Sequence, residues 1–283
     1  MSGGSQCSRP PRGGRGRSPV GRRWRAGLWT VVLAWVLPFG ASAGAADSAG
    51  ADCPPSAGPA LPRGALPRAT RALREQRALR IVAMGSSSTA GAGASSVGTT
   101  YPSRLALELL RRLPGHRIEV INAGINGQEA PDMLTRLQRD VFDRHPDLLI
   151  WQAGSNALLR RVPVDVVERA LTDGIRRSHE HGVDVLLMDL QFAPRVNDMP
   201  ERDRMLAMFG RVAMATGAPV FARFDLMRGW SQALGSRFPQ MLLDDGLHLN
   251  DRSYECLARR LAQVLVDATQ AARGAGDGMA RSR

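Results

Sequence analysis

The sequence predicts an α/β protein of three layers, with helices on both faces of a central, mainly parallel five-stranded sheet. Short apolar runs rich in β-branched residues alternate along the chain with helical patterns of ten or more residues. Such alternation implies βαβ units, and therefore a parallel sheet that is covered on both faces. The length of 283 residues and the 43% of hydrophobic residues suffice for one domain with a substantial core.

The predicted elements follow one another from residue 79 onward. The first strand is a run of apolar residues that ends at Gly85, and Pro102 suits the first position of the helix that follows. Strands are predicted at 79–84, 117–121, 147–151, 183–188 and 219–222. Helices are predicted at 102–112, 131–144, 164–181, 200–216 and 251–270.

Composition divides the chain into four parts. An Arg-rich start and the uncharged apolar run 26–40 precede small residues of an Ala-x-Ala type, which predicts a secretory signal peptide at 1–43. The Ala-, Gly- and Pro-rich residues 44–77 are expected to form a linker or arm, 78–271 the domain, and 272–283 a disordered tail. We therefore expect an exported protein, periplasmic or secreted, with an uncleaved N-terminal membrane anchor as the alternative.

The positive charge gives little support to a nucleic-acid partner. The formal net charge is +12, but seven arginines and no acidic residue lie in the first 43 residues, which leaves about +5 for the rest. We expect no nucleic-acid partner and no stable membrane association once the leader is removed. The isolated histidines, including the pair at 179 and 181, have no neighbouring ligands, so no metal and no cofactor are expected.

Four sequence fragments carry residues of the types that act in catalysis. The first three directly follow predicted strands, where a parallel sheet places its ligands. The four fragments are Gly-Ser-Ser-Ser-Thr-Ala-Gly at 85–91, Asn-Ala-Gly-Ile-Asn-Gly at 122–127, Ala-Gly-Ser-Asn at 153–156, and Asp-Asp-Gly-Leu-His at 244–248. A serine on a tight strand-to-helix turn exposes its hydroxyl, and an aspartate three residues before a histidine can orient the imidazole.

In their order and spacing, the four fragments resemble the blocks of the SGNH (GDSL) hydrolase family over residues 79 to about 270. The resemblance implies a flavodoxin-like α/β/α fold and acyl transfer through an acyl-serine intermediate. It implies Ser87 as nucleophile, His248 as general base and Asp245 as its orienting carboxylate. The oxyanion hole would be formed by Ser87, Gly127 and Asn156.

Two positions depart from the family pattern. Ser86 stands where the family has the Asp of Gly-Asp-Ser, and Ala157 stands where an Asp often follows the asparagine. Because three serines are consecutive, Ser86 or Ser88 remains an alternative nucleophile.

The resemblance implies an esterase or acylhydrolase that acts on a small-molecule or glycan ester, and the predicted leader implies that it is exported. Gln191 and Phe192, just after the fourth strand, are expected to line the substrate site, and the polar content of 191–198 favours a hydrophilic ester such as an O-acetylated glycan. An acyltransferase that uses the same residues, and a non-catalytic binding protein with the same fold, are the alternatives.

Cys53 and Cys256 are expected to form a disulfide. They are the two cysteines that remain after the predicted leader, which takes Cys7 with it. In the helix predicted at 251–270, Cys256 lies opposite the apolar face, so a role as a buried hydrophobic residue is not expected for it.

Overall fold

The computed structural model describes residues 53–55, 60–62 and 64–270; the predicted leader and tail lie outside this part. The strands are β1 (Leu79–Gly85), β2 (Ile118–Gly124), β3 (Leu148–Gln152), β4 (Asp184–Met188) and β5 (Val220–Phe221). The α-helices are α1 (Pro67–Arg74), α2 (Ser87–Ala90), α3 (Tyr101–Arg112), α4 (Ala130–Thr135), α5 (Leu137–Asp140), α6 (Ser155–Leu159), α7 (Val164–Glu180), α8 (Pro194–Asn197), α9 (Arg202–Thr216), α10 (Arg223–Leu234) and α11 (Asp251–Gln270). Short 3₁₀ helices are η1 (Val97–Thr99), η2 (Phe142–Arg144) and η3 (Gly235–Met241).

Among the described residues, the strands form one five-stranded parallel sheet in the order β2-β1-β3-β4-β5. β1 lies between β2 and β3, and its register with β2 runs from Leu79 opposite Ile118 to Gly85 opposite Gly124. The chain moves to one side of β1 for β2 and to the other side for β3. This reversal is the topological switch point at which open α/β sheets bind their ligands.

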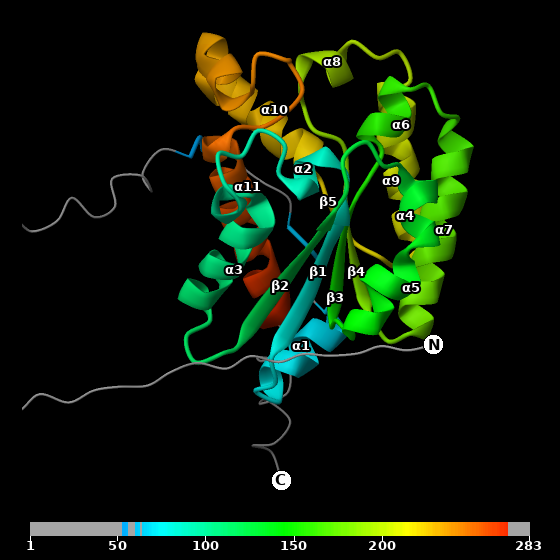
Figure 1. Cartoon of the computed structure of the whole chain (residues 1–283), viewed down its shortest axis with the longest axis vertical. Helices are drawn as coiled ribbons and strands as arrows, with labels where there is room; N and C mark the ends of the chain where they lie inside the picture. The colour runs from blue at the N-terminus through cyan, green and yellow to red at the C-terminus, as the bar shows by residue number, and fades with distance from the viewer. Residues whose placement is uncertain (1–52, 56–59, 63, 271–283) are drawn as a thin grey trace, which may run out of the picture. The chain divides into compact units, whose positions relative to one another are not determined.

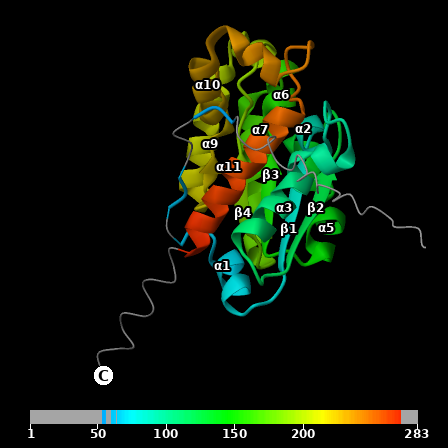
Figure 2. The same cartoon turned by 90° about the vertical axis from the view of Figure 1, so that its left-hand side faces the viewer.

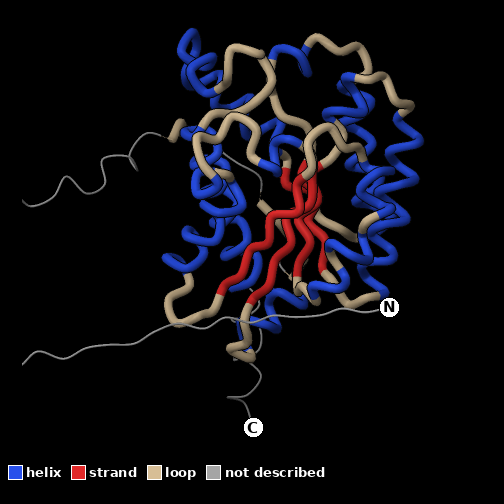
Figure 3. Tube along the Cα trace, in the orientation of Figure 1, coloured by secondary structure: helices blue, strands red, loops and turns tan. Residues whose placement is uncertain are grey.

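Helices cover both faces of the sheet, as Figures 1 and 3 show. Alternate residues of β1 point to opposite sides: Ile81 and Ala83 belong to one buried cluster, and Val82 and Met84 to the other. The first cluster is completed by α1, α3, α10 and α11, and the second by α4–α7 and α9. Figure 2 shows α11 and α3 side by side on one face. The predicted three-layer α/β/α fold is confirmed.

The structure corrects three sequence expectations about secondary structure. α1 lies inside the segment expected as a linker or arm, and its Ala69, Ala72 and Leu73 are buried against the core. The helix predicted at 131–144 is divided into α4, α5 and η2, with the first break at Arg136, whose buried guanidinium turns inward. α10 was not predicted, because Gly229 interrupts its helical pattern. Within the described residues, no helix is long and apolar enough to cross a membrane.

The carboxylate of Asp184, the first residue of β4, holds the N-terminus of α1. Its Oδ2 accepts hydrogen bonds from the backbone N–H groups of Arg68 (2.8 Å) and Ala69 (3.1 Å) in the first turn of α1. These donors have no acceptor within the helix, so a side chain from 115 residues away supplies the N-terminal cap that the local sequence lacks.

We expect Asp184→Ala to lower the free energy of unfolding by about 1–2 kcal/mol, the usual loss for a helix cap. Asp184→Asn keeps an acceptor oxygen for both N–H groups and should lose much less. Urea unfolding at pH 8 measures both, with Asp173→Ala on the surface of α7 as a control that stays within about 0.5 kcal/mol of the parent. Equal losses in the Ala and Asn variants would contradict the capping role.

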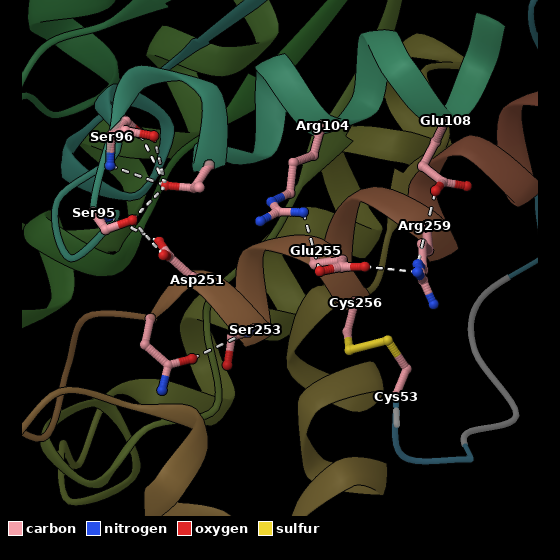
Figure 4. Close-up of polar contacts among 12 residues, drawn as sticks. Cys53, Ser95, Ser96, Arg104, Glu108, Asp251, Ser253, Glu255, Cys256 and Arg259 are labelled. Atoms are coloured by element: carbon pink, nitrogen blue, oxygen red, sulfur yellow. Dashed lines mark hydrogen bonds and ion pairs between the residues drawn. A yellow bond between two sulfur atoms is a disulfide. The ribbon is translucent and has the colours of Figure 1, made fainter. Parts of the chain in front are cut away.

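α11 is fixed to its surroundings by polar contacts and by a disulfide (Figure 4). Glu255 accepts from Arg104 of α3 at 3.0 Å and also pairs with Arg259. The structure joins Cys53 to Cys256 across 203 residues of sequence. The expected location of Cys256 was wrong: its side chain is 3% exposed and belongs to the core, because α11 is buried on most of its surface.

Candidate active site

The predicted site residues Ser87, Gly127 and Asn156 lie beyond the carboxyl ends of β1, β2 and β3. Ser87 begins α2 two residues after β1 ends, and Asn156 lies in the first turn of α6 after β3. Gly127 follows β2. The carboxyl ends of parallel strands share one edge of a sheet, so these three loops meet at the switch point beside β1.

A hydrogen-bonded chain links Ser87, His248 and Asp245. The Nε2 atom of His248 lies 2.9 Å from Ser87 Oγ, and its Nδ1 atom lies 2.5 Å from Asp245 Oδ2. Since a carboxylate only accepts, Nδ1 carries the proton, and Nε2 is left to accept from the serine hydroxyl. This tautomer is the one that a general base for Ser87 requires.

A tight turn between η3 and α11 sets the positions of Asp245 and His248. Leu242 and Leu249 form an isolated antiparallel bridge at its base, and the N–H of Leu243 donates to the carbonyl of His248 at 2.8 Å. Leu242, Leu247 and Leu249 are buried, which anchors the turn to the core. His248 is therefore held between two buried leucines, with its ring toward Ser87.

The environment of Asp245 keeps its carboxyl ionised. Partial burial acts to raise the pKa, but hydrogen bonds from the backbone and ring of His248 and from the N–H of Leu247 outweigh it and lower the pKa to about 2. The Oδ1 atom accepts both backbone N–H groups at 2.9 Å, so Oδ2 is left for the imidazole. The depressed pKa means that the negative charge persists down to pH values near 2.

The three consecutive serines have different surroundings. Ser86 is buried, and both its N–H (3.0 Å) and its hydroxyl (3.2 Å) donate to Gln152 Oε1. Ser88 is buried, and its hydroxyl donates to Gln191 at 3.4 Å. Ser87 is the serine whose hydroxyl meets the imidazole, which favours it over both alternatives.

The segment that carries Gly127 is held against α2 and α6. Gly124 packs so closely on α2 that a Cβ atom there would lie 2.1 Å from the N atom of Ala90. The N–H of Ile125 donates to the carbonyl of Gly85 at 3.0 Å, and Asn156 Nδ2 donates to the carbonyl of Gln128 at 3.1 Å. Gly127 itself has φ +76°, a conformation that favours glycine.

Of the two predicted substrate contacts, one is corrected. Gln191 is 2% exposed and its amide is engaged inside the protein, so the expectation that it lines the site is wrong. Phe192 is partly buried and packs edge-to-face on Phe224 and Phe238, with ring centroids at 5.2 and 5.7 Å. Its contact with substrate stays a prediction.

Three residues near the site were not anticipated. Gln152 ends the otherwise apolar β3, and a polar residue inside a buried strand was the signal that could have identified it. Arg136 is buried and reaches Gln128 Oε1 at 2.6 Å, and Arg160 donates to the carbonyl of Gly127 at 2.7 Å. Neither arginine differs in local pattern from the many exposed arginines of the chain. In the described part of the chain, no group of three or more His, Cys, Asp or Glu could hold a metal ion.

Comparison with known proteins identifies the family of this chain. The fold and the Ser–His–Asp arrangement define an SGNH-type hydrolase. The model of the non-GDSL lipase-like family matches residues 52–271, and the chain belongs to that family. It is 27% identical over 192 residues to an arylesterase of Vibrio mimicus, an alignment that covers 68% of this chain and 90% of the relative. The family and this relative make the chain a carboxylic ester hydrolase.

Solved structures share the fold at low sequence identity. A two-domain esterase active on acetylated mannans aligns with a TM-score of 0.61 at 20% identity; the match covers 72% of this chain but only 53% of that chain. An acetylxylan esterase from Geobacillus stearothermophilus aligns with a TM-score of 0.54 at 19% identity, over 66% of this chain and 93% of the other. This chain thus spans about half the length of the two-domain esterase.

Proposed function

We propose that this ester hydrolase acts through a covalent acyl-enzyme formed on Ser87. His248 Nε2 removes the hydroxyl proton as Ser87 Oγ attacks the ester carbonyl carbon, and Asp245 stabilises the imidazolium that results. The tetrahedral intermediate collapses, the alcohol leaves with the proton from His248, and the acyl group stays on Ser87. Water, activated by the same imidazole, then releases the carboxylic acid and regenerates the serine.

The observation that carries this proposal is the continuous chain from Ser87 Oγ through His248 to Asp245, with distances of 2.9 and 2.5 Å. A binding protein that had lost turnover would have no need for an ionised aspartate that fixes the reactive tautomer. The labelling experiment with Ser87→Ala in the Discussion tests the proposal directly.

We assign the oxyanion hole to the N–H groups of Ser87 and Gly127 and to the side chain of Asn156. α2 begins at Ser87, and the first N–H groups of a helix have no acceptor within it. Asn156 has two N–H bonds on Nδ2; its contact with Gln128 uses one, and the other remains for the substrate oxygen. The Arg160 contact with the Gly127 carbonyl orients the same loop.

We expect Asn156→Ala to lower kcat by roughly 10²–10³-fold with little change in KM, because the lost donor acts on charge that develops in the transition state. Steady-state kinetics on a short-chain nitrophenyl ester measure both constants. The exposed Asn126 in the neighbouring loop supplies the control, Asn126→Ala, which should retain kcat. A change confined to KM would mean that Asn156 only binds substrate.

The proposed substrate is a short-chain acyl ester on a hydrophilic carrier, such as an O-acetylated glycan. The segment after β4 supports this choice: the N–H of Arg195 donates to the carbonyl of Gly246, which brings this exposed, polar residue beside the His248 turn. Hydrolysis of nitrophenyl esters from two to twelve carbons, compared with acetate release from acetylated mannan and xylan, tests it. Preference for long chains would overturn it.

We further propose that the chain works in an oxidising compartment. The Cys53–Cys256 bridge and the Arg-rich, apolar N-terminal sequence support export.

A further inference from the structure

One buried amide joins the three segments that carry Ser87, Asn156 and His248. Gln191 lies three residues beyond the end of β4, and its side chain is not accessible to solvent or substrate. Its Oε1 atom accepts from the hydroxyls of Ser88 (3.4 Å) and Ser155 (3.0 Å), and its Nε2 atom donates to the carbonyl of Leu247 (3.3 Å). These three partners are the immediate neighbours in sequence of Ser87, Asn156 and His248, respectively.

A buried arginine determines which way this amide faces. Arg223, at the start of α10, is 0% exposed, and its Nη2 atom donates to Gln191 Oε1 at 2.9 Å and to the carbonyl of Asp189 at 2.8 Å. With the amide reversed, its NH₂ group would face the guanidinium and its oxygen would face the Leu247 carbonyl, so that donor would meet donor and acceptor would meet acceptor. The orientation described is the one that satisfies all four groups.

Burying the charged guanidinium of Arg223 beside Gln191 costs free energy of desolvation. Burial lowers the pKa of Arg223 to about 10, because desolvation disfavours the charged form. In the part of the chain that the structure describes, its Nη1 atom is buried without a hydrogen-bond acceptor. A buried charge that served packing alone could be replaced by an apolar side chain at little loss of stability.

We propose that Gln191, oriented by Arg223, is a positioning residue that holds the nucleophile, the oxyanion-hole asparagine and the general base in register with one another. The proposal rests on the proposed function of Ser87, Asn156 and His248. Gln191 touches no substrate, so it acts only through the segments it joins. A displacement of about 1 Å among reacting groups can cost on the order of 10²-fold in rate.

This role makes kcat and KM respond differently. Gln191→Met preserves approximate volume and removes all four hydrogen bonds, so we expect kcat to fall roughly 10²-fold while KM stays within about threefold. The rate at which a fluorophosphonate labels Ser87 should fall in parallel with kcat. If Gln191 instead lined the pocket, KM would rise while kcat and the labelling rate were retained, and the proposal would be wrong.

The isosteric variant Gln191→Glu provides the rescue test. A carboxylate can accept from Ser88, Ser155 and Arg223, but it cannot donate to the Leu247 carbonyl. We expect a kcat at least about fivefold above that of Gln191→Met, because three of the four buried hydrogen bonds are restored. Equal kcat values for the two variants would overturn the proposal.

A milder, matched pair of variants separates positioning from stability. Ser155→Ala and Ser178→Ala each remove one buried serine hydroxyl; Ser178 donates only to the Gly174 carbonyl inside α7. Both should lower the unfolding midpoint by similar amounts in urea, but only Ser155→Ala should lower kcat several-fold. If both variants lower kcat equally, or neither does, the inference fails even where Gln191→Met does not fold.

The parent enzyme distinguishes this inference from the proposed function. If the parent hydrolyses no ester and Ser87 takes no label, the proposed function itself is wrong. If the parent is active and labelled, and Gln191→Met has the same kcat and labelling rate, only the positioning role is wrong.

Discussion

Ser87→Ala should abolish ester hydrolysis, with a loss of at least about 10⁴-fold in kcat, because no acyl-enzyme can form without the attacking oxygen. A fluorophosphonate should label the parent at Ser87, as read by mass spectrometry of proteolytic peptides, and should leave Ser87→Ala unlabelled. The fold should persist, since the side chain is partly exposed and the core lies elsewhere. Far-ultraviolet circular dichroism and the unfolding midpoint verify this.

Ser96→Ala, in the exposed loop before η1, is the matched control and should retain both activity and labelling. Label on Ser86 or Ser88 instead would mean that the assignment of Ser87 as the nucleophile is wrong. The surroundings of those two residues argue against this outcome, because both hydroxyls are buried and donate to glutamine side chains.

Asp245→Asn should lower kcat/KM by roughly 10³–10⁴-fold through a change of tautomer rather than of shape. Two backbone N–H groups, those of Leu247 and His248, hold one oxygen of the side chain. In the asparagine variant these donors keep the amide oxygen, and the NH₂ group then faces His248 Nδ1. The ring must accept at Nδ1 and carry its proton on Nε2, where it can no longer accept from Ser87.

The pH profile provides a second measurement. The pKa of about 2 for Asp245 lies below the usual value for Asp, so its carboxylate is lost only as the pH falls through about 2. Above pH 4, protonation of Asp245 should therefore contribute nothing to any fall of log kcat/KM with decreasing pH. The neighbouring exposed Asp244 supplies the control, and Asp244→Asn should keep both rate and profile. A loss of rate above pH 4 that is present in the parent but absent from Asp245→Asn would contradict the low pKa of Asp245.

The sheet was predictable because its strands are short, continuous apolar runs. β1 and β3 were expected at 79–84 and 147–151 and lie at Leu79–Gly85 and Leu148–Gln152. α1 could not be found in the same way. Its N-terminal cap comes from Asp184 on β4, and a contact between residues so far apart leaves no local pattern.

The same distinction, between local sequence patterns and contacts across the fold, applies to the residues of the site. The residues that we assign to chemistry stand in short sequence motifs, so the sequence alone was enough to predict roles for Ser87, Asn156 and His248. The residues that support them make contacts with distant parts of the chain, as Gln191 does with Arg223. Gln191 was expected to be exposed, because it is a polar residue in a predicted loop. The helical pattern of α11 likewise could not reveal that neighbouring segments cover Cys256.

The Cys53–Cys256 bridge has a consequence for the order of events during synthesis. Cys53 leaves the ribosome 203 residues ahead of its partner, so the cross-link cannot close until every strand of the described sheet, and the turn with His248, has been made. A chain interrupted before α11 can never carry it. The bridge is therefore a covalent mark of synthesis beyond Cys256, and its presence on a non-reducing gel distinguishes chains that contain Cys256 from chains that end before it.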